Sequence, residues 1–302
     1  INFHIDTPTY YIFDEVLKIT FGDQPAGWSI LGTAKNLQSI KKDTILKYFK
    51  KHYTVNNTYL ILVGNFNQNK ILKTTEKLFE KYSKEKPPSK FLFNENKIPK
   101  VKGKIYTKKD LKQAHLLILF KTKGLKYLKD RRFVLGVLTS LLGYGLSSRI
   151  FRILREELGI TYYIKVDTDL YTDRGYFFIQ TGCNLEKIES TIKRILEELK
   201  KIQKEKLSGE EIKKSKAILK NSLLSTAESS LNLAYFYGID YLLFNKFFHP
   251  YEYIKKIKVV NEENIKQELK NLITYENLRF GVLVPDEYKK INFNKIFKTL
   301  YN

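Results

Sequence analysis

Residues 162–182 read YYIKVDTDLYTDRGYFFIQTG, in which two alternating runs flank the polar turn Tyr171–Arg174. Alternation with a period of two is typical of β-strands, and a short turn between two such runs predicts an antiparallel pair. Upstream, Leu116–Phe120 is an apolar run bounded by charged residues, which is typical of a buried strand. The sequence therefore predicts a sheet that contains antiparallel pairs.

Helical patterns surround these strands. One predicted helix runs from Asp130 to Leu142 and ends at Gly143-Tyr144-Gly145, and a second runs from Ser147 to Leu158, with Gly159 as its stop signal. After Asn184, apolar residues recur with the period of an amphipathic helix at Ile188, Ile192, Ile195, Leu196, Leu199 and Ile202. Strands and helices in separate blocks indicate the α+β class, with helices covering one face of the sheet.

A plan of helix, turn and strand occurs twice, 220 residues apart. The first copy is Ile40–Gly64, which ends in the apolar run Thr58–Val63, and the second copy is Val260–Val284. Self-similarity at a fixed spacing is the sequence signature of a repeat, so we infer a duplication. The positions that match include Ile45/Ile265, Thr54/Thr274 and Asn57/Asn277.

The duplication predicts how the 302 residues are divided. The second copy opens near Val101, after a segment with three prolines, Pro87, Pro88 and Pro99. We therefore expect residues 1–82 to be the C-terminal part of a first repeat, 83–100 a linker, and 101–302 a complete second repeat. The same spacing places the start of the first repeat upstream of Ile1, so the first repeat is expected to be truncated in this chain.

The net charge is strongly positive, with 54 Lys and Arg against 32 Asp and Glu, or +22. Such a charge first suggests a nucleic-acid partner. Only eight of the basic residues are Arg, however, and the Lys are spread through every segment. Because Arg is the residue suited to bidentate phosphate recognition, we expect a solvated Lys-rich surface and no nucleic-acid partner. Six of the eight Arg lie close together in the sequence, at Arg131, Arg132, Arg149, Arg152, Arg155 and Arg174.

Familiar motifs for cofactors and metals are missing from the sequence. The lone Cys183 excludes a disulfide framework and a cysteine-built metal site. The Gly143-x-Gly145 pair lacks the remaining residues of a phosphate loop, and Phe133–Leu146 is too short and interrupted to span a bilayer, which needs about 20 residues. We therefore expect no membrane partner. The four histidines show no zinc-motif spacing and are expected at the surface or at helix caps: His4, His52, His115 and His249.

The arginine-rich segment carries a family resemblance. Residues 142–162, LGYGLSSRIFRILREELGITY, resemble the second-domain signature of the insulinase/pitrilysin family of zinc metallopeptidases, which includes the mitochondrial processing peptidases. Tyr144 departs from the pattern, since many members have Gly at this position. The resemblance covers nearly the whole chain and continues at Asp6–Pro8, Phe21–Gly27, Ile30–Thr33, Asp173–Phe177 and Lys216–Glu228.

The resemblance implies a peptidase whose zinc site lies outside these residues. Family members pair α+β repeats, and two such units enclose a chamber for unfolded peptides. The first repeat carries an inverted His-x-x-Glu-His motif and a further Glu ligand, which would fall upstream of Ile1. We therefore expect zinc in the full-length protein, no metal ligand within this chain, and no activity of this chain alone.

The residues that the resemblance carries over are Arg155 and Tyr162, seven positions apart across Gly159. In the family these positions contact the substrate carbonyl or the tetrahedral intermediate. The chemistry agrees, because hydroxide attack on a peptide carbonyl creates an oxyanion that cationic or phenolic donors stabilise. The alternative is that Arg155 pairs with a Glu of its own helix and Tyr162 only packs. The remaining expected substrate contacts are Gly143, Gly145, Ser147 and Ser148.

Three hypotheses for function follow. The first is the C-terminal portion of a zinc metalloendopeptidase that cleaves peptides or unfolded chains, which bind as an added strand at a sheet edge. The second is a non-catalytic partner or scaffold subunit of a processing-peptidase-like complex. The third, a polyanion-binding protein, rests only on the +22 charge. The first two predict a homo- or heterodimer with a subunit of the same fold, and we expect a cytoplasmic location.

Overall fold

The computed structural model describes residues 1–157, 159, 161–289, 292 and 297, except for the side chains of Glu157 and Tyr162. The chain forms two compact units. The smaller unit contains Ile30–Leu92 and Leu224–Phe248, and the larger unit contains Asn2–Ser29, Phe93–Leu223 and the chain from His249 onward. The predicted repeat boundaries at residues 82 and 100 stay a prediction about the duplication.

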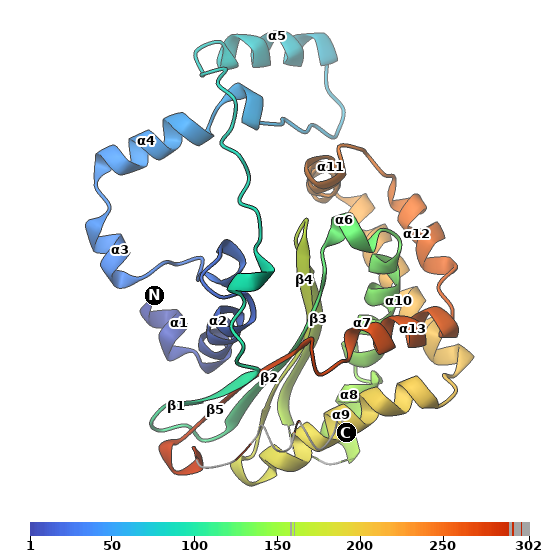
Figure 1. Cartoon of the computed structure of the whole chain (residues 1–302). Helices are drawn as coiled ribbons and strands as arrows, with labels where there is room; N and C mark the ends of the chain where they lie inside the picture. The colour runs from blue at the N-terminus through green and yellow to red at the C-terminus, as the bar shows by residue number, and fades with distance from the viewer. Residues whose placement is uncertain (158, 160, 290–291, 293–296, 298–302) are drawn as a thin grey trace. The chain divides into compact units, whose positions relative to one another are not determined.

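The larger unit is built on one five-stranded sheet with the order β1-β5-β2-β4-β3 (Figure 1). β1 pairs with β5 in parallel, and the other pairs are antiparallel. The predicted strands at 116–120, 162–170 and 175–182 lie in β2, β3 and β4, so the α+β class is confirmed. The strands are β1 (Gly103–Thr107), β2 (Ala114–Lys123), β3 (Thr161–Leu170), β4 (Arg174–Cys183) and β5 (Leu278–Val284).

One face of this sheet is covered by helices of the larger unit (Figure 1). α7 (Arg131–Gly143) packs on β3, and α13 (Glu262–Leu272) packs on α7 and on α9 (Ile188–Lys204). α12 (Pro250–Lys258) packs on α7 as well. The predicted amphipathic pattern of α9 is confirmed, because all six of its predicted apolar positions are buried in the main core.

The second face of the sheet is covered as well, which the sequence did not predict. α2 (Pro8–Phe21) lies across β2 and β5, and its Ile12 and Val16 are fully buried. A Cβ at Gly281 of β5 would lie 2.4 Å from Val16 Cγ2, so only glycine allows the helix to approach this closely. The expectation of helices on one face was therefore wrong, because α2 adds a second, separate core.

The other elements of the larger unit are short, except for α10, which continues into the smaller unit. None of the described helices is long and apolar enough to cross a membrane. These elements are α1 (Asn2–Asp6), η1 (Pro25–Gly27), η3 (Glu95–Lys97), α6 (Leu125–Leu128), α8 (Arg149–Phe151), η4 (Arg152–Glu157), η5 (Leu185–Lys187), α10 (Gly209–Glu228) and η6 (Asp286–Tyr288).

The smaller unit is helical, and its described residues form no strand. Many of its apolar side chains are exposed, including Ile45 and Phe49 of α4 and Leu72 of α5. Amphipathic helices that leave their apolar side uncovered contribute little burial, so the larger unit holds the hydrophobic core. The helices of the smaller unit are α3 (Ala34–Ser39), α4 (Lys42–His52), η2 (Val55–Asn57), α5 (Gln68–Phe79) and α11 (Ser230–Phe244).

Two helices at the spacing of the inferred duplication have matching bounds. α4 begins at Lys42 and ends at His52, and α13 begins and ends 220 residues later. The turns that follow also match, because the Asn57 side-chain amide donates to the His52 carbonyl at 2.9 Å. Asn277 donates to the Leu272 carbonyl at 3.1 Å, the same contact 220 residues on.

The strand that should follow each turn forms in only one copy. Leu278–Val284 is β5 and lies between β1 and β2, whereas residues 58–63 are not in a strand. A strand is stabilised by hydrogen bonds to neighbouring strands, and the described part of the smaller unit offers none. The predicted strand Thr58–Val63 was therefore wrong for this structure, although its apolar pattern matches that of β5.

Removing a side chain from the α2 core tests the role of this helix. We expect Ile12→Ala to lower the free energy of unfolding by about 2–5 kcal/mol, because it leaves a cavity under a fully buried residue. Ile30→Ala is the matched control, since Ile30 is fully exposed and its removal should change stability by less than about 0.5 kcal/mol. Urea unfolding measures both, and equal effects would show that α2 is not part of the core.

Candidate functional site

The loop between α7 and α8 depends on its two glycines. Gly143 ends α7 directly against β3, where a Cβ would lie 2.3 Å from the Val166 Cβ. Gly145 has φ +85°, in the left-handed region that favours glycine. Between them, the Tyr144 hydroxyl donates to Asp167 at 3.3 Å, and burial, with Asp167, raises the pKa of Tyr144 to about 12. The start of this loop is therefore held against β3 by Gly143 and Tyr144.

The two serines after the loop differ in their surroundings. Ser147 is exposed, and its hydroxyl accepts a hydrogen bond from Lys214. Ser148 is buried at the start of α8, and its hydroxyl has no partner among the described residues. The structure thus brings Gly143, Gly145 and both serines into one short segment, and their predicted contacts with substrate stay a prediction.

Arg149 fixes this segment to two neighbouring helices. Its guanidinium makes two hydrogen bonds to Glu211 of α10, at 2.7 and 2.9 Å, and one to Glu198 of α9 at 2.8 Å. The side chains of Arg149 and Glu198 are only 11% and 6% exposed. Burial tends to lower the pKa of Arg149, but its hydrogen bonds to Glu211 and Glu198 raise the pKa overall. The same contact holds the pKa of Glu211 below its usual range.

Arg155 lies on an unusual helix directly after this clamp. Residues Arg152–Glu157 form a π-helix, whose Ile153 and Leu154 are buried in the main core. Arg155 itself is exposed, and its guanidinium lies over the Phe151 ring at 5.3 Å. π-helical turns are rare and occur often at functional sites. The sequence carried no signal for this turn, since its apolar pattern fits an ordinary helix equally well.

Tyr162 is the second residue of β3, an edge strand of the sheet. Its side chain lies outside the described residues, so the expected meeting of Tyr162 with Arg155 stays a prediction. The backbone is irregular at this point, because the β3–β4 register shifts between Thr161 and Tyr163. A bulge of this kind changes the direction of side chains and is common beside active sites.

The arginine cluster that drew attention in the sequence is mainly structural. Arg131 makes a bidentate pair with buried Glu268, at 2.6 and 3.1 Å. Arg174 pairs with Glu95 at 3.0 Å and lies over the Phe93 ring. Together with Arg149, these residues link separate elements of the larger unit. Arg155 differs from them, because its guanidinium lies over an aromatic ring of its own segment.

With this geometry in place, the comparison with known proteins identifies the family. Residues 39–219, more than half of the chain, match the family described as the Peptidase M16 inactive domain. The chain belongs to this family. The resemblance to insulinase/pitrilysin-type zinc metallopeptidases is thereby confirmed.

Curated relatives of the chain are named zinc proteases. An uncharacterized zinc protease of Rickettsia felis is 31% identical over 261 residues, which cover 86% of this chain and 61% of the relative. The uncharacterized zinc protease YmxG of Bacillus subtilis is 29% identical and is covered to 68%, with 94% of this chain aligned. This M16 chain thus spans about three fifths of the length of the Rickettsia relative.

Solved structures show the same fold. A protease from Helicobacter pylori has a TM-score of 0.79 at 20% identity, covering 94% of this chain and 69% of that one. A peptidase M16 inactive domain from Pseudomonas fluorescens has a TM-score of 0.83 at 17% identity, covering 94% and 67%. These likenesses confirm the M16-type α+β architecture.

Zinc does not fit the residues that the structure describes. In that part of the chain, no three His, Cys, Asp or Glu side chains lie close enough together to hold a metal ion. Cys183 is buried, and burial raises the pKa of its thiol to about 11. A cysteine binds a metal as the thiolate, which this burial disfavours. The described residues of this M16 chain therefore do not supply a ligand set for a metal ion.

One histidine contradicts the expectation of surface or cap positions. His249 caps α12, as expected, but His115 of β2 is buried and lies 3.1 Å from the Tyr163 hydroxyl. Both residues pair in register with Gly182 of β4, whose missing side chain leaves room for them. Burial lowers the pKa of His115 to about 4, so the ring is neutral near pH 7. The expectation was wrong because the sequence around His115 does not show that another strand supplies a buried partner for the ring.

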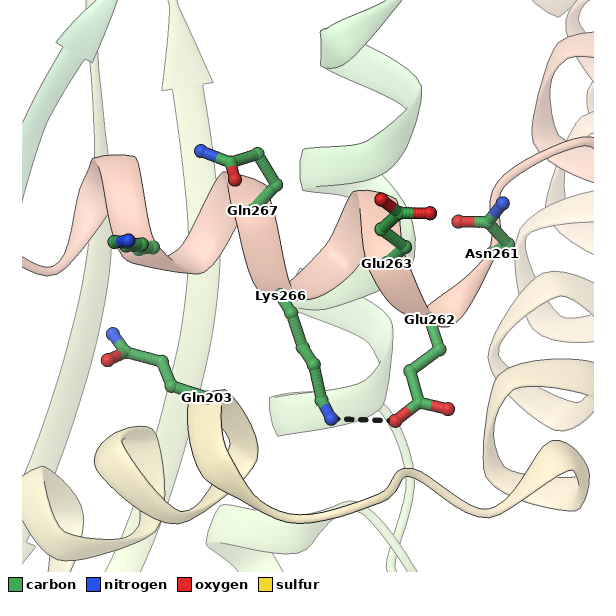
Figure 2. Close-up of a pocket in the computed structure, with 7 residues that line it drawn as sticks. Gln203, Asn261, Glu262, Glu263, Lys266 and Gln267 are labelled. Carbon is green, nitrogen blue, oxygen red and sulfur yellow. Dashed lines mark ion pairs between the residues drawn. The ribbon is translucent and has the colours of Figure 1, made fainter.

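A surface pocket of about 490 Å³ lies on α13 and the end of α9 (Figure 2), and none of its lining residues belongs to the arginine-rich segment. Its Glu262 pairs with Lys266 at 2.8 Å and accepts a hydrogen bond from the Leu207 amide at 3.0 Å. Lys266 holds the pKa of Glu262 below its usual range. These groups join the segment after α9 to α13, so we assign the pocket no chemistry.

The Arg149 clamp predicts a large loss of stability on mutation. We expect Arg149→Met to lower the free energy of unfolding by about 3–5 kcal/mol, because it leaves the buried Glu198 carboxylate unpaired. Arg155→Met, on the same segment but exposed, is the matched control and should change stability by less than about 0.5 kcal/mol. Chemical denaturation measures both variants, and a stable Arg149→Met protein would contradict the clamp.

His115 predicts a specific dependence of stability on pH. Its pKa is lower in the folded chain, about 4, than its ordinary value of 6.5. The unfolded chain therefore takes up the proton first, and the stability present above pH 6.5 is lost as the pH falls toward 4, by about 3 kcal/mol at most. In His115→Gln this contribution should disappear. Unfolding curves at several pH values measure the difference, and parallel pH profiles for the two proteins would refute the assignment.

Proposed function

We propose that this chain is the substrate-contacting, C-terminal portion of a zinc metalloendopeptidase that cleaves peptides or unfolded chains inside a chamber. Arg155 and Tyr162 contact the substrate carbonyl and the oxyanion formed from it. The zinc ligands belong to a part of the protein outside these 302 residues. Family membership and the relatives' names as zinc proteases support the class of reaction.

The observation that carries the proposal is the presentation of Arg155. Its neighbours Ile153 and Leu154 are buried, and Arg149, six residues before it, is clamped between α9 and α10. The Arg155 side chain thus projects from a backbone that is anchored by two buried apolar neighbours and by the ion pairs of Arg149. Stabilising a transition state requires donors that are already in position, because reorganisation during the reaction would cost free energy.

The chemistry of arginine suits this role. Attack of hydroxide on a peptide carbonyl places a negative charge on the carbonyl oxygen, and a guanidinium keeps its positive charge throughout the working pH range. The cation–π contact with Phe151 orients the side chain of Arg155 without neutralising it. A carboxylate partner would reduce the charge that is available to the substrate.

β3 supports the proposed mode of substrate binding. It lies at one edge of the sheet, and its first residues are Thr161 and Tyr162. An extended peptide that adds to such an edge binds through main-chain hydrogen bonds, with modest preference for its side chains. A peptide bound along the start of β3 would pass close to Tyr162, and the chain leading into β3 carries Arg155.

Assembly completes the proposed enzyme. A homo- or heterodimer with a subunit of the same fold encloses the chamber, and this chain alone is inactive. The alternative is a non-catalytic partner or scaffold subunit, which would bind no zinc of its own. Zinc content of the natural full-length protein separates the two: about one zinc per chain supports the peptidase, and none supports the partner subunit.

Replacing Arg155 in the full-length protein tests its role directly. We expect Arg155→Ala to lower kcat/KM by about 100- to 1000-fold, as removal of an oxyanion donor does in other hydrolases. Arg155→Lys should recover part of the rate, because it restores the charge without the planar fork. Cleavage of a fluorogenic peptide measures all variants.

The control for this experiment is Arg194→Ala, on the outer side of α9, where Arg194 is 41% exposed and pairs with Glu197. It should leave kcat/KM unchanged. Zinc content should be the same in all variants, since the described residues offer no ligand set. Full activity of Arg155→Ala with normal zinc content would contradict the proposed contact between Arg155 and the oxyanion.

A further inference from the structure

The larger unit contains a cavity of about 660 Å³ beside the sheet, where β2 ends and β5 begins. This volume lies within the range of small-molecule sites, about 300–1000 Å³. The cavity shares no lining residue with the segment that carries Arg155 and Tyr162. Its charged lining consists of five cations and two carboxylates, namely Lys121, Lys123, Arg131, Arg174, Lys270, Glu95 and Glu268.

Both carboxylates of the cavity already have partners. Glu268 holds Arg131 through two hydrogen bonds, and Glu95 pairs with Arg174 at 3.0 Å. Among the described residues, no carboxylate lies within ion-pair distance of Lys121 or Lys123. Lys121 and Lys123 are two residues apart in β2, so both side chains point to the same face of the sheet.

Two further cations lie beside Lys121 on neighbouring strands. Leu119 of β2 pairs in register with Arg279 of β5, which places Arg279 and Lys121 on one face. Lys102 directly precedes β1 on the other side of β5, and its carbonyl accepts the Phe280 amide. Cationic residues therefore lie on the adjacent strands β2 and β5 and directly before β1.

Arg279 is the most unusual member of this group, because only 3% of it is exposed. Its guanidinium donates to the main-chain carbonyls of Glu276 and Leu278, and its Nε has no partner among the described residues. The carboxylate that interacts with its charge is that of Glu276, whose side chain is 90% exposed and lies 3.7 Å from the Lys102 ammonium. A buried arginine without a buried carboxylate costs free energy.

The cations also destabilise one another. Burial, then the charge of Arg279, lowers the pKa of both Lys102 and Lys121, and burial lowers the pKa of Arg279. Like charges that share a site are stabilised when an anion binds between them. The two carboxylates that line the cavity, Glu268 and Glu95, already pair with arginines, so the positive charge of the lysines remains.

We propose that this cavity binds a small oxyanion of the phosphate class, held by Lys121 and Lys123 with Arg279 behind them. Lysine binds phosphate as a point charge, and a phosphate group carries about two negative charges near pH 7. A divalent anion therefore neutralises the two unpaired lysines, which a single carboxylate does not. The same chemistry is offered by free phosphate or pyrophosphate and by a small phosphomonoester.

Calorimetric titration of the full chain at constant ionic strength tests the site. The three probes are inorganic phosphate, pyrophosphate and phosphoserine, which distinguish a free anion from a phosphomonoester. We expect one site per chain and a dissociation constant at least about tenfold weaker in Lys121→Ala, which loses a charge-assisted hydrogen bond. Lys121→Arg keeps the charge and should retain most of the affinity.

The matched control is Lys193→Ala, which removes the same charge from the outer side of α9, where Lys193 is 64% exposed. It should bind as the unchanged chain does. No saturable binding of any probe would overturn the proposal. Equal weakening in Lys121→Ala and Lys193→Ala would also overturn it, because binding would then follow total charge.

Thermal unfolding provides a second readout that does not depend on affinity alone. Without anion, Lys121→Met should melt at the same temperature as the unchanged chain or higher, because it removes a repulsive charge. Pyrophosphate should raise the melting temperature of the unchanged chain and raise that of Lys121→Met by less at the same concentration. A large loss of stability in Lys121→Met without anion would show that Lys121 has a structural partner, and would contradict the site.

Discussion

Burial of β2 and β4 on both faces is the constraint on which the larger unit depends. Seven successive residues of β2 and nine of β4 are buried, so both faces of the sheet need cover. Helices α7, α9 and α13 lie on one face, and α2, from the beginning of the chain, covers the other. Segments far apart in the sequence therefore pack on opposite faces of a single sheet, because apolar surface on either face costs free energy in water.

Charged side chains connect the elements around this core, and they do so with guanidinium groups. Arg131, Arg149 and Arg174 each bind a carboxylate from a distant part of the sequence. Planar, permanently charged donors suit such half-buried junctions better than lysine does. Arg155 and the cations near β5 stand apart from this scheme, since their charge is left available. That difference separates the residues to which we assign chemistry from those that hold the fold together.

Local patterns predicted the elements well where the period of apolar residues within one element carries the signal. The period of α9, the β3–β4 pair and the repeated helix α4/α13 all appear where the sequence placed them. Prediction failed where a partner decides the outcome. Residues 58–63 match β5 in pattern but have no neighbouring strand among the described residues, and His115 is buried because Tyr163 and Gly182 accommodate it. The sequence did not predict the π-helix at Arg155, because its apolar pattern fits an ordinary α-helix equally well.

The sequence by itself determined the α+β class and the family, because the period of each element and the order of the motifs can be read along the chain. It also singled out Arg155 and Tyr162 within the arginine-rich segment. Only the tertiary structure decided that Arg149 is a clamp, that α2 lies on the second face, and that Lys121 stands beside Arg279. Each of these is a contact between residues far apart in the chain, and the free energy of such a contact depends on burial and distance, which no local pattern contains.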